Sequence, residues 1–373
     1  MKTARRAAIS LFSGAGGMDI GIRKAGFSVL AELEIDRFCC QTLRAAAQRE
    51  GSGARVIEAD IRTVDPKGLA ETLGMPPRKL DLLFGGPPCQ PFSLAGKRNG
   101  LCDDRGPLLF EIIRFAAHFK PKAILVEQVK GLLSAKGADG EKGGAFSAFL
   151  RGLESAGYTA GWEVCCAADY GIPQLRERLF VVATRRAGGF RFPERTHVPP
   201  GGGQAGVGLP GYVTVGEALA GLGRPSPKAR GAEDRIRDGS HVDVTPSRDR
   251  ERISHVPEGS CLAAQTHLGA DIRGGLTAKD TTKYLRLSRK RPANTLRCGE
   301  IFFHPTEDRY LTPREYMRIH GYSDDYKLLG PVRSRSGSAK YLDQHRQVAN
   351  SVPPPLAYLL GCAILKRLEK GNP

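Results

Sequence analysis

Apolar and polar positions along the first 185 residues follow the pattern of short buried strands separated by helices. Runs typical of strands lie at residues 7–12, 28–34, 54–60, 80–86, 122–128 and 178–185. Between them, apolar side chains recur at helical spacing at residues 18–27, 37–50, 108–119 and 144–158. Because this alternation is typical of a mainly parallel sheet covered on both faces, we predict an α/β fold. Ligands of such sheets bind at the carboxyl ends of the strands, so residues that follow the strands are the candidates for chemistry.

The periodic pattern stops in the middle of the chain. Residues 196–212 are rich in Gly and Pro, which predicts a linker or long loop. Residues 213–300 carry many charges and few periodic segments, as expected of a smaller, loop-rich domain. Helical signals return at residues 312–322 and in the apolar segment 354–370. The pattern therefore predicts two domains.

Composition agrees with a folded protein of this size. The chain has 373 residues, of which 40% are hydrophobic and 25% charged, and about 150 residues per domain would allow two or three domains. No apolar run reaches the roughly 18–20 residues of a membrane span, and the first residues lack a secretory apolar region, so we expect a cytoplasmic protein with no membrane association. Nine cysteines without a C-x-x-C spacing indicate reduced thiols and predict no metal site.

Positive charge is in excess and is unevenly distributed. The net charge is +17, of which residues 1–180 carry +5 and residues 181–373 carry +12. The densest basic run, residues 283–297, contains no acid. A run this short is usually a solvated face, but Lys and Arg can also neutralise backbone phosphates. The excess indicates a polyanionic partner, with nucleic acid as the first candidate.

A glycine loop follows the first predicted strand. In Phe12-Ser13-Gly14-Ala15-Gly16-Gly17 the glycines would let backbone N–H groups approach a ligand at a helix N-terminus, although many such loops are only tight turns. The loop does not match the dinucleotide fingerprint, because Asp19 takes the place of the third glycine. Glu34 and Asp60 follow the next two strands, where a carboxylate can bind a ribose hydroxyl or simply cap a helix.

Three further strand ends carry reactive groups. Cys89 lies in the rigid loop Gly85-Gly86-Pro87-Pro88-Cys89-Gln90-Pro91-Phe92-Ser93, where it is either a buried apolar residue or a nucleophile. Glu127 ends the next strand and could protonate or hold a ring nitrogen. Arg176 and Arg178, just before the last strand, would lie on one side of an extended chain. A structural ion pair is the alternative role for one of these two arginines.

Together these motifs resemble the DNA cytosine-carbon-5 methyltransferase family through almost the whole chain. The matching segments are LFSGAGG, PPCQPFSLAGKR, EQV, QLRER, LTPREYMRIHGY and QVANSVPPPLAYLLG, in the family's order. The chain departs from the usual pattern at Ser10, where an aspartate is often found, at Gln128 in place of Asn, and at Ala349 in place of Gly. None of these changes removes a group that performs chemistry.

The resemblance implies a role for each matching residue. Cys89 would attack carbon 6 of cytosine, Glu127 would contact N3, and Arg178, with Arg176, would bind the base. The residues expected to bind the cofactor S-adenosylmethionine are Phe12, Gly14, Gly16, Glu34, Ile35, Asp60, Pro87, Asn350 and Ser351. The residues expected to contact DNA are Gln90, Ser93, Lys97, Arg98, Arg289, Lys290 and Arg291.

The implied chemistry sets further expectations. Thiolate addition at carbon 6 activates carbon 5 to accept a methyl group, so one hard step becomes several easier ones. The base must be flipped out of duplex DNA, at a cost of a few kcal/mol. We expect the polar segment 93–106 to close over the flipped base and exclude water.

The predicted architecture is a Rossmann-like, S-adenosylmethionine-dependent catalytic domain with a second, smaller target-recognition domain. The catalytic domain would comprise residues 1–189 and 303–373, and the recognition domain residues 190–302. We expect an enzyme that acts as a monomer on duplex DNA and is associated with the nucleoid in a bacterium.

Three alternatives compete with this interpretation. An RNA cytosine-5 methyltransferase is disfavoured, because residues 301–315 lack the Cys-Phe-Thr element of the tRNA-directed branch. A DNA-binding regulator without activity is disfavoured by the presence of Cys89, Glu127 and Arg178. A nicotinamide dehydrogenase would leave the PPCQ loop unexplained.

Overall fold

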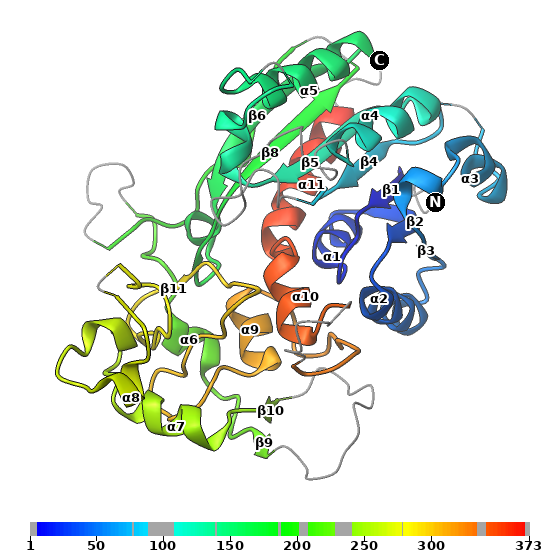
Figure 1. Ribbon diagram of the computed structural model, residues 1–373. Helices are drawn as coiled ribbons and strands as arrows, with labels where there is room; N and C mark the ends of the chain where they lie inside the picture. The colour runs from blue at the N-terminus through cyan, green and yellow to red at the C-terminus, as the bar shows by residue number, and fades with distance from the viewer. Residues whose placement is uncertain are drawn as a thin grey trace. The chain divides into compact units, whose positions relative to one another are not determined.

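The computed structural model describes nine stretches of the chain. They are residues 6–76, 78–88, 108–138, 140–185, 188–200, 208–227, 241–277, 279–333 and 341–369 (Figure 1). Contacts along the chain group into two compact units. The first comprises Met1–Cys166, Glu177–Glu194 and Pro354–Pro373, and the second comprises Ala167–Arg176 and Arg195–Pro353.

The first unit is built on a sheet of seven described strands in the order β3-β2-β1-β4-β5-β8-β6. The strands are β1 (Arg6–Leu11), β2 (Phe27–Glu34), β3 (Arg55–Glu58), β4 (Leu82–Gly85), β5 (Ala123–Gln128), β6 (Thr159–Cys166) and β8 (Glu177–Thr184). Neighbours from β3 to β5 pair in parallel, whereas β8 is antiparallel to both β5 and β6. The predicted α/β class with a mainly parallel sheet is confirmed.

Helices flank this sheet (Figure 1). They are α1 (Gly17–Lys24), α2 (Arg37–Glu50), α3 (Pro66–Thr72), α4 (Leu108–Phe119), α5 (Gly144–Ser155) and α11 (Pro354–Glu369), with short 3₁₀ turns η1 (Ile61–Thr63) and η4 (Lys130–Ser134). One core cluster joins Phe115 of α4 and Phe149 of α5 to Leu83, Ile124 and Val181 of the central strands. Because alternate strand residues point to one face, these side chains define the layer between the sheet and the α4–α5 pair.

Helices α1 and α11 cross at two glycines, although they lie at opposite ends of the sequence. A Cβ atom built on Gly21 would lie 2.5 Å from the backbone oxygen of Pro354, and one built on Gly361 would lie 2.7 Å from Cβ of Ala25. The segment Gln344–Glu369, which includes α11, is apolar and long enough to span a membrane, but 61% of that apolar stretch is buried inside the protein. Packing in the protein core therefore accounts for its apolar character.

A buried charged cluster ties α1 to β2. Nη1 of Arg23 lies 2.5 Å from Oε1 of Glu32, and its Nε lies 3.0 Å from Oε2 of Glu50. Asp19, fully buried in the first turn of α1, also interacts with Arg23. Burial raises the pKa of Asp19 to about 6 and that of Glu32 to about 8. Burial disfavours the ionised carboxyl groups, and the positive charge of Arg23 opposes that effect on both pKa values.

The second unit is rich in loops. Its described elements are η5 (Ala167–Tyr170), β7 (Gln174–Leu175), α6 (Val215–Leu219), β9 (Ser226–Pro227), β10 (Val242–Asp243), α7 (Ser247–Ser254), η6 (Leu262–Ala264), α8 (Ala270–Arg273), β11 (Ala293–Asn294), α9 (Pro313–Ile319) and α10 (Gln344–Asn350). Two short parallel pairs, β9 with β10 and β7 with β11, join its distant segments. The side chains of Phe302, Phe303 and Tyr316 are fully buried and form its centre.

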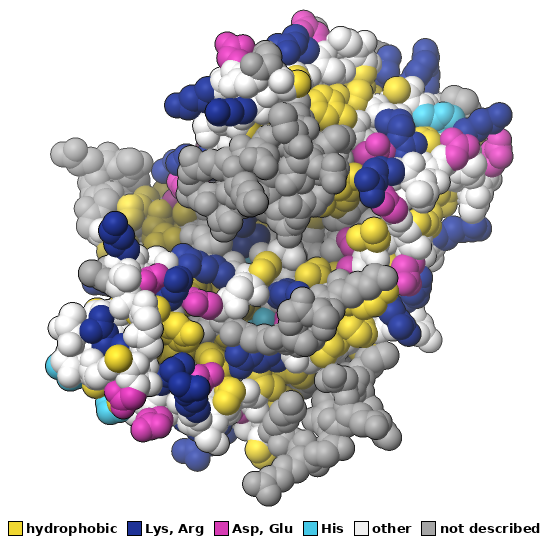
Figure 2. All heavy atoms as spheres, viewed as in Figure 1, with side chains coloured by type: hydrophobic (Ala, Val, Ile, Leu, Met, Phe, Trp, Pro, Cys, Tyr) yellow, Lys and Arg dark blue, Asp and Glu magenta, His cyan; other side chains and the backbone are white. Residues whose placement is uncertain are grey.

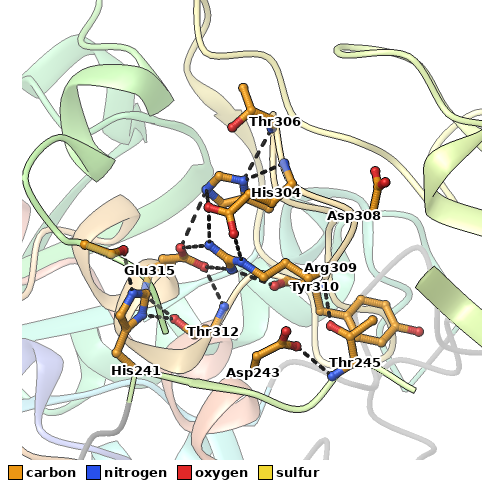
Figure 3. Close-up of polar contacts among 12 residues, drawn as sticks. His241, Asp243, Thr245, His304, Thr306, Asp308, Arg309, Tyr310, Thr312 and Glu315 are labelled. Carbon is orange, nitrogen blue, oxygen red and sulfur yellow. Dashed lines mark hydrogen bonds and ion pairs between the residues drawn. The ribbon is translucent and has the colours of Figure 1, made fainter. Parts of the chain in front are cut away.

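An ion-pair cluster fixes the start of α9 (Figure 3). The guanidinium of Arg309 donates to both carboxylate oxygens of Glu315, at 2.8 and 2.7 Å, and to Glu307 at 2.9 Å. Glu315 also accepts from the backbone N–H of Thr312, which completes a capping box. Nδ1 of His241 lies 2.8 Å from the Thr312 hydroxyl. The charge of the buried Arg309 is thus compensated within the unit.

Candidate active site

The glycine loop after β1 has an unusual backbone. Phe12, Gly14 and Gly16 have φ angles of 55°, 54° and 78°, all in the left-handed region that favours glycine. For a bulky residue such as Phe12 this conformation is strained, and strain of this kind concentrates at functional sites. Gly16 is the N-cap of α1 and supplies no side-chain acceptor. The first turn of α1 therefore has backbone N–H groups that no N-cap side chain satisfies.

Glu34, at the end of β2, holds the glycine loop in place. Its carboxylate accepts backbone N–H bonds from Gly14 at 2.7 Å, Ile35 at 2.9 Å and Asp36 at 2.8 Å. Burial raises the pKa of Glu34, and the N–H donors of Asp36 and Gly14 oppose that effect. The next side chain, Ile35, is 61% exposed, which is unusual for a large apolar residue that directly follows a largely buried strand. Ile35 thus offers an apolar surface next to a carboxylate.

Asp60 follows β3 and acts as the N-cap of η1. Its carboxylate accepts from the backbone N–H of Arg62 and forms an ion pair with the guanidinium of the same residue at 2.5 Å. The hydrogen bond from the Arg62 side chain lowers the pKa of Asp60. Asp60 therefore fills the capping role in this structure, and its role toward a cofactor stays a prediction.

Glu127 and Arg178 form an ion pair between neighbouring strands. Nε of Arg178 lies 3.0 Å from Oε1 of Glu127, and both side chains are largely buried. The pair forms because β5 and β8 are antiparallel neighbours, with Glu127 opposite Phe180. A Cβ atom on Gly86 would lie 3.2 Å from Oε2 of Glu127, so glycine leaves room beside the carboxylate. The structure thus brings together two of the predicted base-binding residues.

Gln128 connects β5 to the loop that carries the candidate nucleophile. Its amide Nε2 donates to the backbone oxygen of Pro87 at 2.9 Å, and its Oε1 accepts from the backbone N–H of Val129 at 3.1 Å. The side chain is completely buried. Gln128 therefore fixes the backbone of Pro87, two residues before Cys89.

Several predicted site residues lie outside the described part of the chain. Residues 89–107 are not among the described residues, and they include Cys89, Gln90, Ser93, Lys97, Arg98 and the segment expected to close over the base.

Arg176 contacts a different part of the molecule from Arg178. Its Nη2 donates to the backbone oxygens of Ala349 at 2.9 Å and Ser351 at 3.0 Å, within the second unit. Asn350, between them, accepts a hydrogen bond from the thiol of Cys298. Arg176 therefore holds the end of α10 and the residue that follows it, which include the predicted cofactor residues Asn350 and Ser351.

Sequence reasoning did not single out every residue of these networks. The sequence identifies Gln128 only as a departure from Asn, and it assigns no role to Gln174 or His320, whose side chains are hydrogen-bonded to each other at 2.9 Å. Each lies inside a family-like motif, EQV, QLRER or TPREYMRIHGY, which is the only local signal that could have identified it.

Comparison with known proteins identifies the class. A family model, C-5 cytosine-specific DNA methylase, matches residues 7–366, and the chain therefore belongs to this family. The chain is 35% identical to the Type II methyltransferase M.PspPI of a Psychrobacter species, with 97% of this chain and 79% of that protein covered. It is 31% identical to the Type II methyltransferase M.NgoMIV of Neisseria gonorrhoeae, with 98% of each covered.

A solved structure supports the fold. It is a prophage-encoded protein of Escherichia coli described as a DNA modification methyltransferase, with a TM-score of 0.71 and 21% identity, covering 98% of this chain and 99% of that one. The predicted family, fold class and enzyme class are confirmed: the protein is a DNA (cytosine-5) methyltransferase. Membership of the family implies that it uses S-adenosylmethionine as the methyl donor.

Proposed function

We propose that the enzyme methylates a cytosine that is flipped out of a specific duplex DNA sequence, through a covalent bond between Cys89 and carbon 6. The observation that carries this proposal is the Glu127–Arg178 pair beside the Pro87 loop, which Gln128 holds. Residues 1–189 and 303–373 would form the catalytic domain. Residues 190–302, most of which belong to the second unit, would recognise the target. The Type II relatives support a role in restriction–modification.

The residues of the first unit fit S-adenosylmethionine. A Cβ on Gly14 would meet nothing within 4 Å, so space for a ligand is open beside the loop. The N–H groups at the start of α1 suit the carboxylate of the methionine part, Glu34 suits the ribose hydroxyls, and the exposed Ile35 suits the flat adenine ring. Phe12, Gly16, Asp60, Pro87, Asn350 and Ser351 complete the proposed cofactor set. When bound, S-adenosylmethionine supplies an electrophilic methyl group from its sulfonium.

The protein's own residues would then perform the covalent chemistry. The Cys89 thiolate forms a bond to carbon 6 while Glu127 delivers a proton toward N3, which leaves carbon 5 electron-rich. Carbon 5 takes the methyl group, a base removes the proton from carbon 5 as the carbon–sulfur bond breaks to release the thiolate, and the N3 proton returns to Glu127. Arg178, paired with Glu127 at 3.0 Å, orients the carboxyl group and can hold the base.

Trapping with a fluorinated base tests this mechanism. The probe is a pool of duplex DNA in which every cytosine is replaced by 5-fluorocytosine, so the target sequence need not be known. Fluorine cannot leave as the carbon-5 proton does, so with S-adenosylmethionine present the enzyme is expected to remain bound to the DNA under denaturing conditions.

Peptide mapping should locate the adduct on Cys89, and ordinary DNA and a 5-fluorocytosine tRNA pool should leave the enzyme free. Methylation of ordinary DNA without any trapped adduct, or an adduct on another cysteine, would show that the proposed nucleophile is wrong.

The proposed DNA contacts include the basic run 283–297. In Figure 2, Lys and Arg side chains form several groups on the visible face, interspersed with acidic side chains. Within the run, Arg286 is buried and pairs with Asp308, and Arg289 pairs with Glu258. Lys290 and Arg291 are exposed, and no described acidic side chain is paired with either of them. These two side chains are therefore the best placed for phosphate contact.

Neutralising Lys290 and Arg291 should weaken the salt dependence of DNA binding. Each phosphate contact contributes about 0.9 to the slope of log K against log salt, so the double change to Gln is expected to reduce the slope by about 2. Fluorescence anisotropy with duplex DNA at several salt concentrations measures the slope. Changing the exposed Lys67 and Lys79 to Gln serves as the charge-matched control and should leave the slope unchanged. Equal slopes for both double variants would exclude the proposed contact.

A further inference from the structure

A chain of buried hydrogen bonds in the second unit centres on His320, at the end of α9. Nδ1 of His320 lies 2.9 Å from Nε2 of Gln174, and Nε2 of His320 lies 2.9 Å from the backbone oxygen of Ser351. His320 and Gln174 are completely buried. The chain of bonds thus links β7 and α9 to the residues that follow α10.

The partners of His320 permit one arrangement of protons. The backbone N–H of Leu296 donates to Oε1 of Gln174 at 3.1 Å, which fixes the orientation of the amide. Nε2 of Gln174 must then donate to Nδ1 of His320, so Nδ1 carries no proton. The Ser351 carbonyl can only accept, so Nε2 of His320 carries the proton. With His320 in this neutral tautomer, each of these three hydrogen bonds has one donor and one acceptor, which makes the arrangement rigid.

The same backbone oxygen receives a second donor. Nη2 of Arg176 lies 3.0 Å from the oxygen of Ser351 and 2.9 Å from that of Ala349. Carbonyl groups at the C-terminal end of a helix lack intrahelical donors. Arg176 and His320 supply hydrogen-bond donors to the carbonyl oxygens of Ala349 and Ser351 at the end of α10. Arg176 and His320 together hold the segment Ala349–Ser351 from two elements.

We propose that His320 is a positioning residue that sets the affinity for S-adenosylmethionine by fixing the backbone of Asn350–Ser351. This inference rests on the proposed function, in which Asn350 and Ser351 contact the cofactor. The imidazole acts through the Ser351 carbonyl, and a backbone shift of the order of 1 Å is enough to weaken a positioned contact strongly. Gln can replace His in this role, because its amide can accept from Gln174 and donate to Ser351.

The experiment compares His320→Leu, His320→Asn and His320→Gln with the wild-type enzyme. The readouts are the Kd for S-adenosylmethionine from calorimetry, and KM and kcat for methyl transfer to DNA. His320→Leu is expected to raise Kd and KM for the cofactor about tenfold while kcat at saturation changes less than about threefold. His320→Asn, whose shorter side chain cannot reach both partners, should behave in the same way if the Leu variant does not fold. His320→Gln should return both constants to within about twofold of wild type.

His304→Leu is the control for a general loss of packing. His304 is partly buried in the same unit, and its Nδ1 accepts from the backbone of Thr306 and Glu307, not from the segment after α10. It should lower thermal stability without changing the cofactor Kd. A wild-type Kd in folded His320→Asn, or an equal rise of Kd in His304→Leu, would overturn the inference. If the wild-type enzyme forms no adduct with 5-fluorocytosine DNA, the proposed covalent mechanism fails instead.

Discussion

Replacement of Glu127 by Gln is expected to lower kcat for methyl transfer about 10³-fold while DNA affinity changes little. Proton transfer by a positioned side chain contributes roughly 10²–10⁴-fold to a rate. The glutamine amide can still form a hydrogen bond with a ring nitrogen, but it cannot deliver a proton to N3. Without that proton, the negative charge that thiolate addition creates in the ring is not neutralised. Single-turnover kinetics at saturating DNA and cofactor measure this step directly.

Glu177→Gln provides the matched control for this experiment. Glu177 begins β8, one residue before Arg178, and its exposed carboxylate pairs with Lys130 at 3.2 Å. Its replacement removes one negative charge from β8, the strand that pairs with β5, but no proposed proton donor, so kcat should stay within about twofold of wild type. A Glu127→Gln enzyme that retained more than a tenth of the wild-type kcat would assign the protonation of N3 to another group.

The strands of the first unit could be predicted because most of them are buried on both faces. The runs at β1, β2, β4, β5 and β8 are nearly continuous apolar segments, the usual sign of a strand inside a covered sheet. The sequence does not predict β6, because this edge strand is only partly buried and its sequence TAGWEVCC has no clear period. The antiparallel direction of β8 was also not visible, since a buried strand reads the same in either direction.

The groups expected to do chemistry could be located, but the contacts that hold them could not. Strand ends and motif order pointed to Glu34, Glu127 and Arg178, because residues at those places share one edge of a sheet. The bond from Gln128 to Pro87 joins residues 41 positions apart, and the bond from Arg176 to Ala349 joins residues 173 positions apart. No local sequence pattern encodes partners this far apart. The sequence therefore predicts the same role for Arg176 and Arg178, although their side chains bind different segments.

The substitution Gly21→Ala, which adds one methyl group, is expected to lower the free energy of unfolding of the first unit by about 3 kcal/mol. A Cβ atom there would lie 2.5 Å from the backbone oxygen of Pro354, 2.5 Å from the backbone nitrogen of Tyr358 and 2.6 Å from Cβ of Ala357. Rotation of a side chain cannot relieve a clash with backbone atoms, so α1 and α11 must separate. Overpacking of this kind costs about 1–3 kcal/mol or more, which outweighs the gain of up to about 1 kcal/mol in helix propensity.

Gly68→Ala, in α3 of the same unit, is the matched control in which the added methyl group meets no clash. A Cβ atom on Gly68 would lie 3.5 Å from Asp65, an ordinary contact, so this change should stabilise the protein by up to about 1 kcal/mol. Thermal unfolding of both variants measures the difference. Because α1 begins at the glycine loop, Gly21→Ala should also weaken S-adenosylmethionine binding, whereas Gly68→Ala should not. If the Gly21→Ala protein is as stable as the Gly68→Ala protein, the expected clash between α1 and α11 does not occur.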